Sequence, residues 1–179
     1  MSSAAEVRAA TGDDVAAICE ICATAYRETY RGLLTEDYIE RVIRDFYNVA
    51  RVTGEVEPSP PFWLGYQVVE EDGRVLGAAG GGVAEEGIGE LYVIYLDPAE
   101  RGRGLGTLLL DRVIEQARAA GAREMWVSVV VDNNKGIPFY RARGFEQVEK
   151  RQAFGSGPDD DVWSWRMRRP LPSEARPLP

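Results

Sequence analysis

The stretch Glu90-Leu-Tyr-Val-Ile-Tyr-Leu-Asp-Pro-Ala-Glu-Arg-Gly-Arg-Gly-Leu-Gly-Thr-Leu-Leu-Leu110 decides the fold of this 179-residue chain. Its first half is an uninterrupted apolar and aromatic run that Asp97-Pro98 stops, which is typical of a strand buried on both faces. Its second half is a loop with two arginines and three glycines, and apolar residues then recur at helical spacing from Leu108 to Ile114. The pattern predicts a buried strand, a glycine-rich turn and a helix.

The glycine-rich loop has the composition of an anion-binding site. The first N–H groups of a helix have no partner inside the helix, and the aligned peptide dipoles leave partial positive charge there. Gly102, Gly104 and Gly106 lack the side chains that would hold an anion away from the backbone, and Arg101 and Arg103 add full positive charges. We therefore expect a diphosphate to bind here.

Two familiar phosphate-binding motifs do not fit this loop. A Walker loop requires a lysine after its last glycine, and none follows these glycines. A dinucleotide fingerprint requires Gly-x-Gly-x-x-Gly, but Thr107 stands at the place of the third glycine. What remains is the pattern Arg101-x-x-Gly104-x-Gly106 between a strand and a helix.

A second motif follows the next predicted strand. Asn133 precedes Tyr140 by seven residues, and Gly144-Phe145 ends the predicted helix. Together the two motifs resemble those of the GCN5-related N-acetyltransferases (GNAT), which bind acetyl-coenzyme A (acetyl-CoA) and in which the first motif forms the pyrophosphate loop. Gly136 replaces the alanine that is usual in this family, and Pro138 is a departure that costs little within a first helical turn.

The resemblance covers about residues 6–168 and implies a fold. It is an α/β fold of the α+β type, with a GNAT-like mixed, mostly antiparallel sheet of six to seven strands and about four helices on its two faces. We expect one domain over residues 1–169 and a proline-rich, disordered tail over residues 170–179.

Periodicity and turn signals place the other elements along the chain. The glycines at 77 and 80–82 within a predicted strand are assigned mainly to close packing, with a substrate path as the alternative. We expect strands over residues 4–10, 62–70, 75–84, 125–131, 145–154 and 162–167, helices over about 15–30, from 35 onward and over about 104–120, and a loop over 53–61.

The resemblance also assigns roles in cofactor binding. The pantetheine arm and the acetyl carbonyl would lie against the backbone of the central strand, where it splays from its neighbour. The expected cofactor-binding residues are Ile94, Tyr95 and Leu96 on the strand, Arg101, Gly102, Arg103, Gly104, Leu105, Gly106 and Thr107 in the pyrophosphate loop, and Asn133.

Two residues match catalytic positions of the family. Tyr140 corresponds to a tyrosine that reaches the thioester sulfur in many members and can protonate the departing thiolate, since a phenol titrates near pH 10, above a thiol at about 8.5. Glu90 stands where several members carry a glutamate that removes the amine proton, often through water. A buried tyrosine and a solvated carboxylate at a strand end are the purely structural alternatives. Candidates to shape the acceptor pocket are Tyr26, Tyr30, Tyr92 and Tyr95.

Composition excludes several other kinds of chemistry. The chain has no histidine, which removes Ser-His triads, histidine general bases and most zinc sites, and we expect no metal. Cys19 and Cys22 form a lone Cys-x-x-Cys on one apolar helical face, which favours buried reduced thiols over a redox pair. The net charge of −8 disfavours general nucleic-acid binding; it would attract cationic amines or simply maintain solubility.

No apolar run is long enough to cross a membrane, and the first residues lack the features of a signal peptide, so we expect a soluble, cytoplasmic protein. The predicted activity is that of an acetyl-CoA-dependent N-acetyltransferase, with acetyl-CoA as the acyl-donor substrate and direct attack by a primary amine in a ternary complex. A small-molecule amine is the expected acceptor. The alternatives are acetylation of a protein N-terminus or lysine, and a non-catalytic acyl-CoA-binding module. We expect no nucleic-acid or membrane partner, and a monomer or homodimer.

Overall fold

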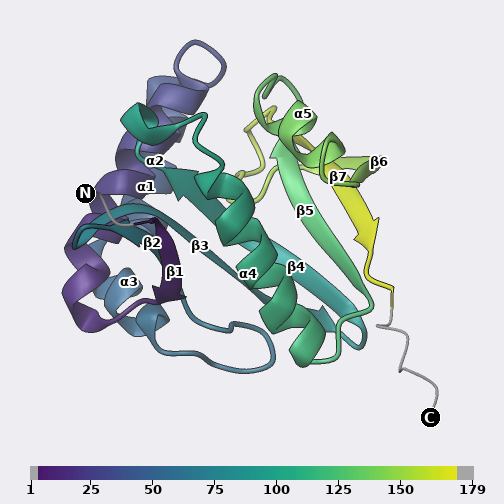
Figure 1. Ribbon diagram of the computed structural model, residues 1–179. Coiled ribbons are helices and arrows are strands. Elements are labelled where there is room, and N and C mark those ends of the chain that lie inside the picture. The colour runs from purple at the N-terminus through teal and green to yellow at the C-terminus, as the bar shows by residue number, and fades with distance from the viewer. Residues whose placement is uncertain (1–3, 173–179) are drawn as a thin grey trace.

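A seven-stranded sheet lies at the centre of the fold, with helices on both of its faces (Figure 1). The computed structural model describes residues 4–172. The strands follow the order β1-β2-β3-β4-β5-β7-β6, and all neighbours are antiparallel except β4 and β5, which confirms the predicted mixed sheet. The strands are β1 (Glu6–Ala9), β2 (Gln67–Glu71), β3 (Arg74–Glu85), β4 (Ile88–Leu96), β5 (Glu124–Val130), β6 (Glu146–Gln152) and β7 (Trp163–Pro170).

One face of the sheet is covered by a single long helix and the other face by two helices. α4 packs on one face, α1 and α3 pack on the other, and α2 packs against α1 (Figure 1). None of the helices within residues 4–172 is long and apolar enough to span a membrane. The α-helices are α1 (Val15–Tyr30), α2 (Glu36–Phe46), α3 (Val49–Val56), α4 (Leu105–Ala119) and α5 (Gly136–Arg141), and the short 3-10 helices are η1 (Gly12–Asp14) and η2 (Pro98–Glu100).

The helix α3 corrects the first part of the predicted loop over residues 53–61, whereas residues 57–61 lie outside helices and strands as predicted. Within residues 4–172 the α-helices number five instead of about four. Asn48 caps its start by accepting a hydrogen bond from the backbone N–H of Arg51 at 2.9 Å. Val52 and Val56 are buried against α1 and the sheet. This burial outweighs the low helix propensity of Gly54. The local composition alone had favoured a loop for this segment.

The segment before β2 is the second correction, because the strand begins at Gln67 and not near residue 62. Gly65 has a φ of +83°, which an extended strand cannot accommodate. Trp63 covers Gly80 of β3, and its Nε1 donates a hydrogen bond to the carbonyl oxygen of Glu55 at 2.6 Å. A side chain on Gly80 would collide with the tryptophan ring, so this glycine serves close packing, as predicted.

β4, α4 and β5 form a crossover unit with two parallel strands. The strands pair only between Ile88–Leu91 and Glu124–Val127, although β4 continues to Leu96 and β5 to Val130. Beyond the paired residues the two strands diverge (Figure 1). Their unpaired halves bound a wedge in the sheet, and this wedge positions the site described below.

The C-terminal part of the chain extends further than expected. β7 reaches Pro170, and Leu171 is buried in the core on the α4 side of the sheet, where its N–H donates a hydrogen bond to the carbonyl oxygen of Arg123 at 2.8 Å. β7 therefore extends beyond residue 167, the end that we expected for this strand. Residues 173–179 of the predicted tail lie outside the described residues.

Candidate functional site

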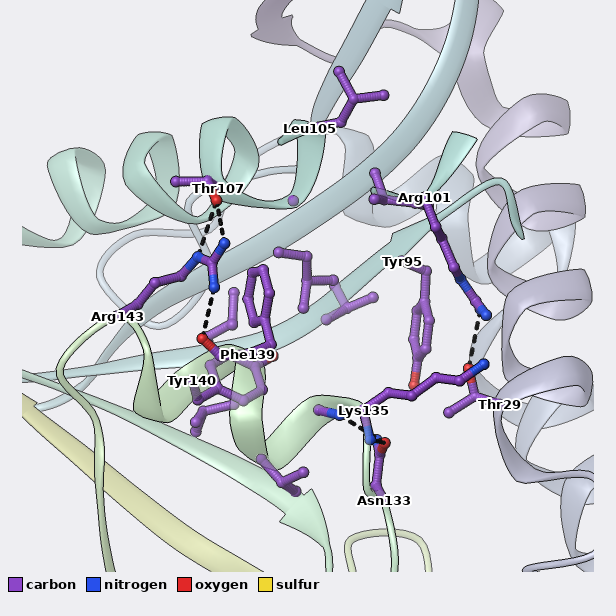
Figure 2. A pocket seen from close by; sticks show the side chains of 18 of the residues that line it. Thr29, Tyr95, Arg101, Leu105, Thr107, Asn133, Lys135, Phe139, Tyr140 and Arg143 are labelled. Atoms are coloured by element: carbon purple, nitrogen blue, oxygen red, sulfur yellow. Dashed lines mark hydrogen bonds between the residues drawn. The ribbon is translucent and has the colours of Figure 1, made fainter. Parts of the chain in front are cut away.

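The wedge between β4 and β5 contains a cavity of about 350 Å³. Its walls come from β4, β5, the loop that leads into α4, and the segment from residue 133 to 143, with Thr29 and Tyr30 at the end of α1 (Figure 2). All predicted catalytic and cofactor-binding residues line the cavity except Glu90 and Arg103. Those that line it are Ile94, Tyr95, Leu96, Arg101, Gly102, Gly104, Leu105, Gly106, Thr107, Asn133 and Tyr140.

The loop before α4 exposes backbone N–H groups to the cavity. Gly102 and Gly104 have φ values of +80° and +79°, and Gly104 caps the helix. The first bond inside the helix runs from the N–H of Leu108 to the carbonyl oxygen of Gly104, so the N–H groups of residues 105–107 have no helical partner. A Cβ on Gly106 would lie 3.2 Å from the ring of Phe139, so a larger residue would require that ring to move by a few tenths of an ångström. The geometry suits an anion.

The two loop arginines have different surroundings. Arg101 lines the cavity, donates a hydrogen bond to Thr29 Oγ1 at 3.2 Å and lies 3.5 Å from a carboxylate oxygen of Glu28 (Figure 2). Arg103 instead forms ion pairs with Glu71 at 2.7 Å and Glu100 at 2.5 Å, and it does not line the cavity. Arg103, which we expected to bind the cofactor, is therefore held away from the cavity, by Glu71 at the end of β2 and by the neighbouring Glu100.

Two cations in the cavity wall, Lys135 and Arg143, were not predicted. Arg143 donates to Thr107 Oγ1 from Nε at 2.9 Å and from Nη2 at 2.6 Å, and to the carbonyl oxygen of Phe139 from Nη1 at 2.7 Å (Figure 2). Its guanidinium carbon lies 3.7 Å from the centroid of the Phe139 ring. The spacing of four residues between Phe139 and Arg143 places them one helical turn apart, a signal that the sequence did contain.

Asn133 has a structural task as well as a place in the cavity wall. Its Oδ1 accepts hydrogen bonds from the backbone N–H of Gly136 at 2.8 Å and of Lys135 at 3.3 Å. These bonds satisfy amides at the start of α5. They fix the position of the asparagine side chain beside Lys135 in the cavity (Figure 2).

Tyr140 is buried in the wall of the cavity. Its ring packs edge-on against Phe139 and Phe145, with centroid distances of 5.1 and 5.5 Å. Its hydroxyl makes no hydrogen bond to another residue within 4–172. Burial raises the pKa of Tyr140, with smaller effects from Tyr30, which also raises it, and Arg143, which lowers it. The phenol therefore stays protonated and can donate a hydrogen bond to a group in the cavity.

The predicted tyrosines of the acceptor pocket divide into two groups. Tyr30, Tyr92 and Tyr95 line the cavity, whereas Tyr26 does not. Tyr26 packs among other aromatic rings, at 4.5 Å from Tyr30 and 6.0 Å from Tyr95 between centroids. Burial raises the pKa of Tyr26, Tyr30 and Tyr95, so their hydroxyls remain neutral hydrogen-bonding groups.

Glu90 is buried and bound to an arginine. Its Oε1 and Oε2 accept hydrogen bonds from Nη1 and Nη2 of Arg166 at 2.5 and 2.8 Å, and both side chains are largely shielded from solvent. Arg166 also donates to Ser128 Oγ at 2.9 Å, and Ser128 lines the cavity. The solvated strand-end carboxylate that we considered is thus not observed; Glu90 is instead linked to the cavity through Arg166 and Ser128.

A family model described as "Acetyltransferase (GNAT) family" matches residues 15–145 of the chain. An uncharacterized N-acetyltransferase of Methanocaldococcus jannaschii is 36% identical over 93 residues, 48% of this chain and 40% of that protein. The mycothiol acetyltransferase of Beutenbergia cavernae is 32% identical over 93 residues, 52% of this chain and 31% of that protein. In both cases the chain spans less than half the length of the relative.

Among solved structures, the PaiA N-acetyltransferase of Thermoplasma acidophilum in complex with coenzyme A is similar in fold. The TM-score is 0.79 at 23% sequence identity, and the alignment covers 94% of this chain and 100% of that one. At 23% sequence identity, this similarity shows that the two chains share a fold and shows nothing about the substrate.

Proposed function

The chain belongs to the acetyltransferase (GNAT) family, and from this premise we propose that it transfers the acetyl group of acetyl-CoA to a primary amine. The observation that carries the proposal is the wedge between β4 and β5, which leads to the free N–H groups of residues 105–107. A pantetheine arm fits between the unpaired strands, and the diphosphate reaches the start of α4, where N–H groups and the helix dipole stabilise it. Arg101 also lines the cavity, on the side of Thr29.

The chemistry requires three groups around the thioester. The uncharged amine attacks the carbonyl carbon. Backbone N–H groups that face the wedge from residues 94–96, on the half of β4 that pairs with β3 but not with β5, stabilise the oxyanion that forms. As the C–S bond breaks, the Tyr140 hydroxyl donates a hydrogen bond to the departing sulfur. The amine nitrogen gives up a proton to a base, and the thiolate takes one up, so that the products are an amide and free coenzyme A.

We propose Glu90 as that base, acting through a water molecule. A carboxylate has more lone pairs than the two that Arg166 occupies, so it can accept a further hydrogen bond. Ser128, which shares Arg166 with Glu90, lines the cavity and marks the path that such a relay would take. The guanidinium also keeps the carboxylate at a fixed place beside the wedge.

The acceptor is proposed to enter from the face opposite α4. Val127 and Val129 of β5 belong to the core on the α4 side, so Ser128 between them points to the other face, where it is exposed. Tyr92 also lines the cavity and is 52% exposed. The cavity thus reaches both faces of the sheet, and an amine can approach the thioester without passing the coenzyme.

Contacts between α2 and the loop of residues 153–162 favour a small acceptor. The Tyr38 hydroxyl lies 3.1 Å from Ser156 Oγ, and Arg41 forms an ion pair with Asp160. These contacts join the two halves of the molecule on the acceptor side of the sheet and restrict the space that a protein terminus would need. An acetyltransferase that acts on a protein N-terminus or lysine is therefore the less favoured alternative.

A screen for thiol release tests the proposed activity. Acetyl-CoA is incubated with the chain and with polyamines, aminoglycosides, amino acids or short peptides, and free thiol is measured. Release that depends on a small amine supports the proposal, whereas release with peptides alone would identify a protein acetyltransferase. Tight binding of acetyl-CoA without release on any amine would instead favour a non-catalytic acyl-CoA-binding module.

A further inference from the structure

Arg143 is a cation in the cavity wall whose charge is not neutralised by a carboxylate. Within residues 4–172 it forms no ion pair, whereas Arg101 has Glu28 and Arg103 has both Glu71 and Glu100 as partners. Its hydrogen bonds go to a hydroxyl and to a carbonyl oxygen, which orient the guanidinium without cancelling its charge. An arginine left unpaired in a chain of net charge −8 is therefore a candidate for binding an anion.

The surroundings of Arg143 add to this charge. Thr107, the hydroxyl that Arg143 contacts, is the third residue of α4, so the guanidinium lies beside the positive end of the helix dipole. Two positive groups at one place repel each other, and a bound anion relieves that repulsion. The Phe139 ring beneath the guanidinium and the carbonyl oxygen of the same residue hold the side chain in place. A preorganised arginine loses less entropy when it binds a phosphate.

We propose that Arg143 binds a phosphate group of coenzyme A and supplies the affinity that we first assigned to Arg103. The inference rests on the proposed function, because it concerns the same cavity. The phosphate belongs either to the diphosphate or to the 3′-phosphate of the ribose; guanidinium recognition is the same for both. Figure 2 shows Arg143 and Arg101 on opposite sides of the cavity, so the two arginines can contact different phosphate oxygens.

The test compares Arg143→Gln with Arg141→Gln as a matched control. Arg141 carries the same charge, is exposed and does not line the cavity. For Arg143→Gln we expect the KM and the Kd for acetyl-CoA to rise about 10- to 100-fold, the range for a lost charge-assisted hydrogen bond, with kcat changed less than about 3-fold. Acetyl-pantetheine lacks the ribose and all phosphates of acetyl-CoA. Its affinity for each of the two variants should therefore equal its affinity for the wild type.

The outcomes separate a phosphate contact from a structural one. Equal losses of affinity for acetyl-CoA and acetyl-pantetheine, or no loss for either, would overturn the proposal. Arg143→Lys keeps a charge and should restore part of the affinity for acetyl-CoA. Should Arg143→Gln fail to fold, Arg143→Met preserves the packing on Phe139 and provides the same comparison between ligands.

Acetyl-dephospho-CoA, which lacks the 3′-phosphate, shows which phosphate Arg143 contacts. Binding by the wild-type protein separates a failure of the proposed function from a failure of the role of Arg143. If Arg143→Gln no longer weakens the binding of acetyl-dephospho-CoA, the contact is to the 3′-phosphate; if it weakens it as much as that of acetyl-CoA, the contact is to the diphosphate. Wild-type protein that binds none of these donors would refute the proposed function itself. Wild-type binding that equals that of Arg143→Gln would refute only the role of Arg143.

Discussion

Removing the hydroxyl of Tyr140 isolates its proposed role at the thioester. Tyr140→Phe keeps the ring that packs against Phe139 and Phe145, and the hydroxyl has no partner among residues 4–172 whose bond would be lost. Stability should therefore change by less than about 1 kcal/mol. A hydrogen bond to a developing negative charge contributes about 1.5–3 kcal/mol, so kcat should fall roughly 10- to 150-fold while the KM for acetyl-CoA stays within about 3-fold.

The pH dependence makes the same prediction sharper. Burial raises the pKa of Tyr140, so the phenol remains protonated across an assay range of about pH 7 to 10, whereas an ordinary tyrosine would be half ionised near pH 10. The ratio of wild-type to Tyr140→Phe rates should thus stay constant over that range. Steady-state thiol release at each pH measures it, with Tyr92→Phe as a control that alters an exposed hydroxyl in the same cavity. A ratio that falls toward one between pH 9 and 10, or an unchanged kcat at neutral pH, would refute this role.

Four further predictions follow from the same structure. Gly106→Ala places a Cβ 3.2 Å from the Phe139 ring in the cavity wall; calorimetry should show CoA binding weakened about 10-fold or more, with thermal stability changed by only about 1 kcal/mol because alanine favours the helix. Glu90→Gln should lower kcat in the thiol-release assay by about 100-fold or more, because the amide cannot take up the amine proton, and an unchanged kcat would remove Glu90 as the base. Arg8 lowers the pKa of Asp14 by hydrogen bonding, so Asp14 stabilises the fold above pH 4 and loses this contribution on acidification; Asp14→Asn should cost about 1–3 kcal/mol at pH 7 in urea unfolding, and a difference that does not shrink below pH 4 would contradict the ion pair. Burial raises the pKa of the Cys22 thiol, which should react with a thiol reagent only after denaturation; rapid labelling of the folded chain would contradict its burial.

Local signals explain which parts of the fold were predictable. The hairpin between β2 and β3 turns at Asp72-Gly73, a dipeptide that favours type I′ turns, and both residues have positive φ, as such a turn requires. The predicted helix from residue 35 onward is α2, and Thr35 caps it by accepting a hydrogen bond from the N–H of Tyr38. The missed helix α3 and the late start of β2 depend on Val52 and Trp63 packing against distant strands. In a segment this short, the hydrophobic periodicity of the sequence does not reveal such tertiary contacts.

The parts of the site that the sequence could predict are two continuous segments of the chain. The loop and the Asn133 to Tyr140 segment converged on one cavity because a strand and a helix connect them in a crossover of fixed hand. Charge partners were not predictable in this way. Glu90 of β4 pairs with Arg166 of β7, and Arg103 of the loop before α4 pairs with Glu71 of β2. Only the three-dimensional structure therefore shows which cations face the cavity.

The most direct test of the central claim is a crystal structure of the chain with coenzyme A. The account predicts the pantetheine arm between the unpaired halves of β4 and β5, and diphosphate oxygens within hydrogen-bonding distance of backbone N–H groups of residues 102–107. A coenzyme bound elsewhere on the molecule, or one whose diphosphate lies away from those N–H groups, would contradict it.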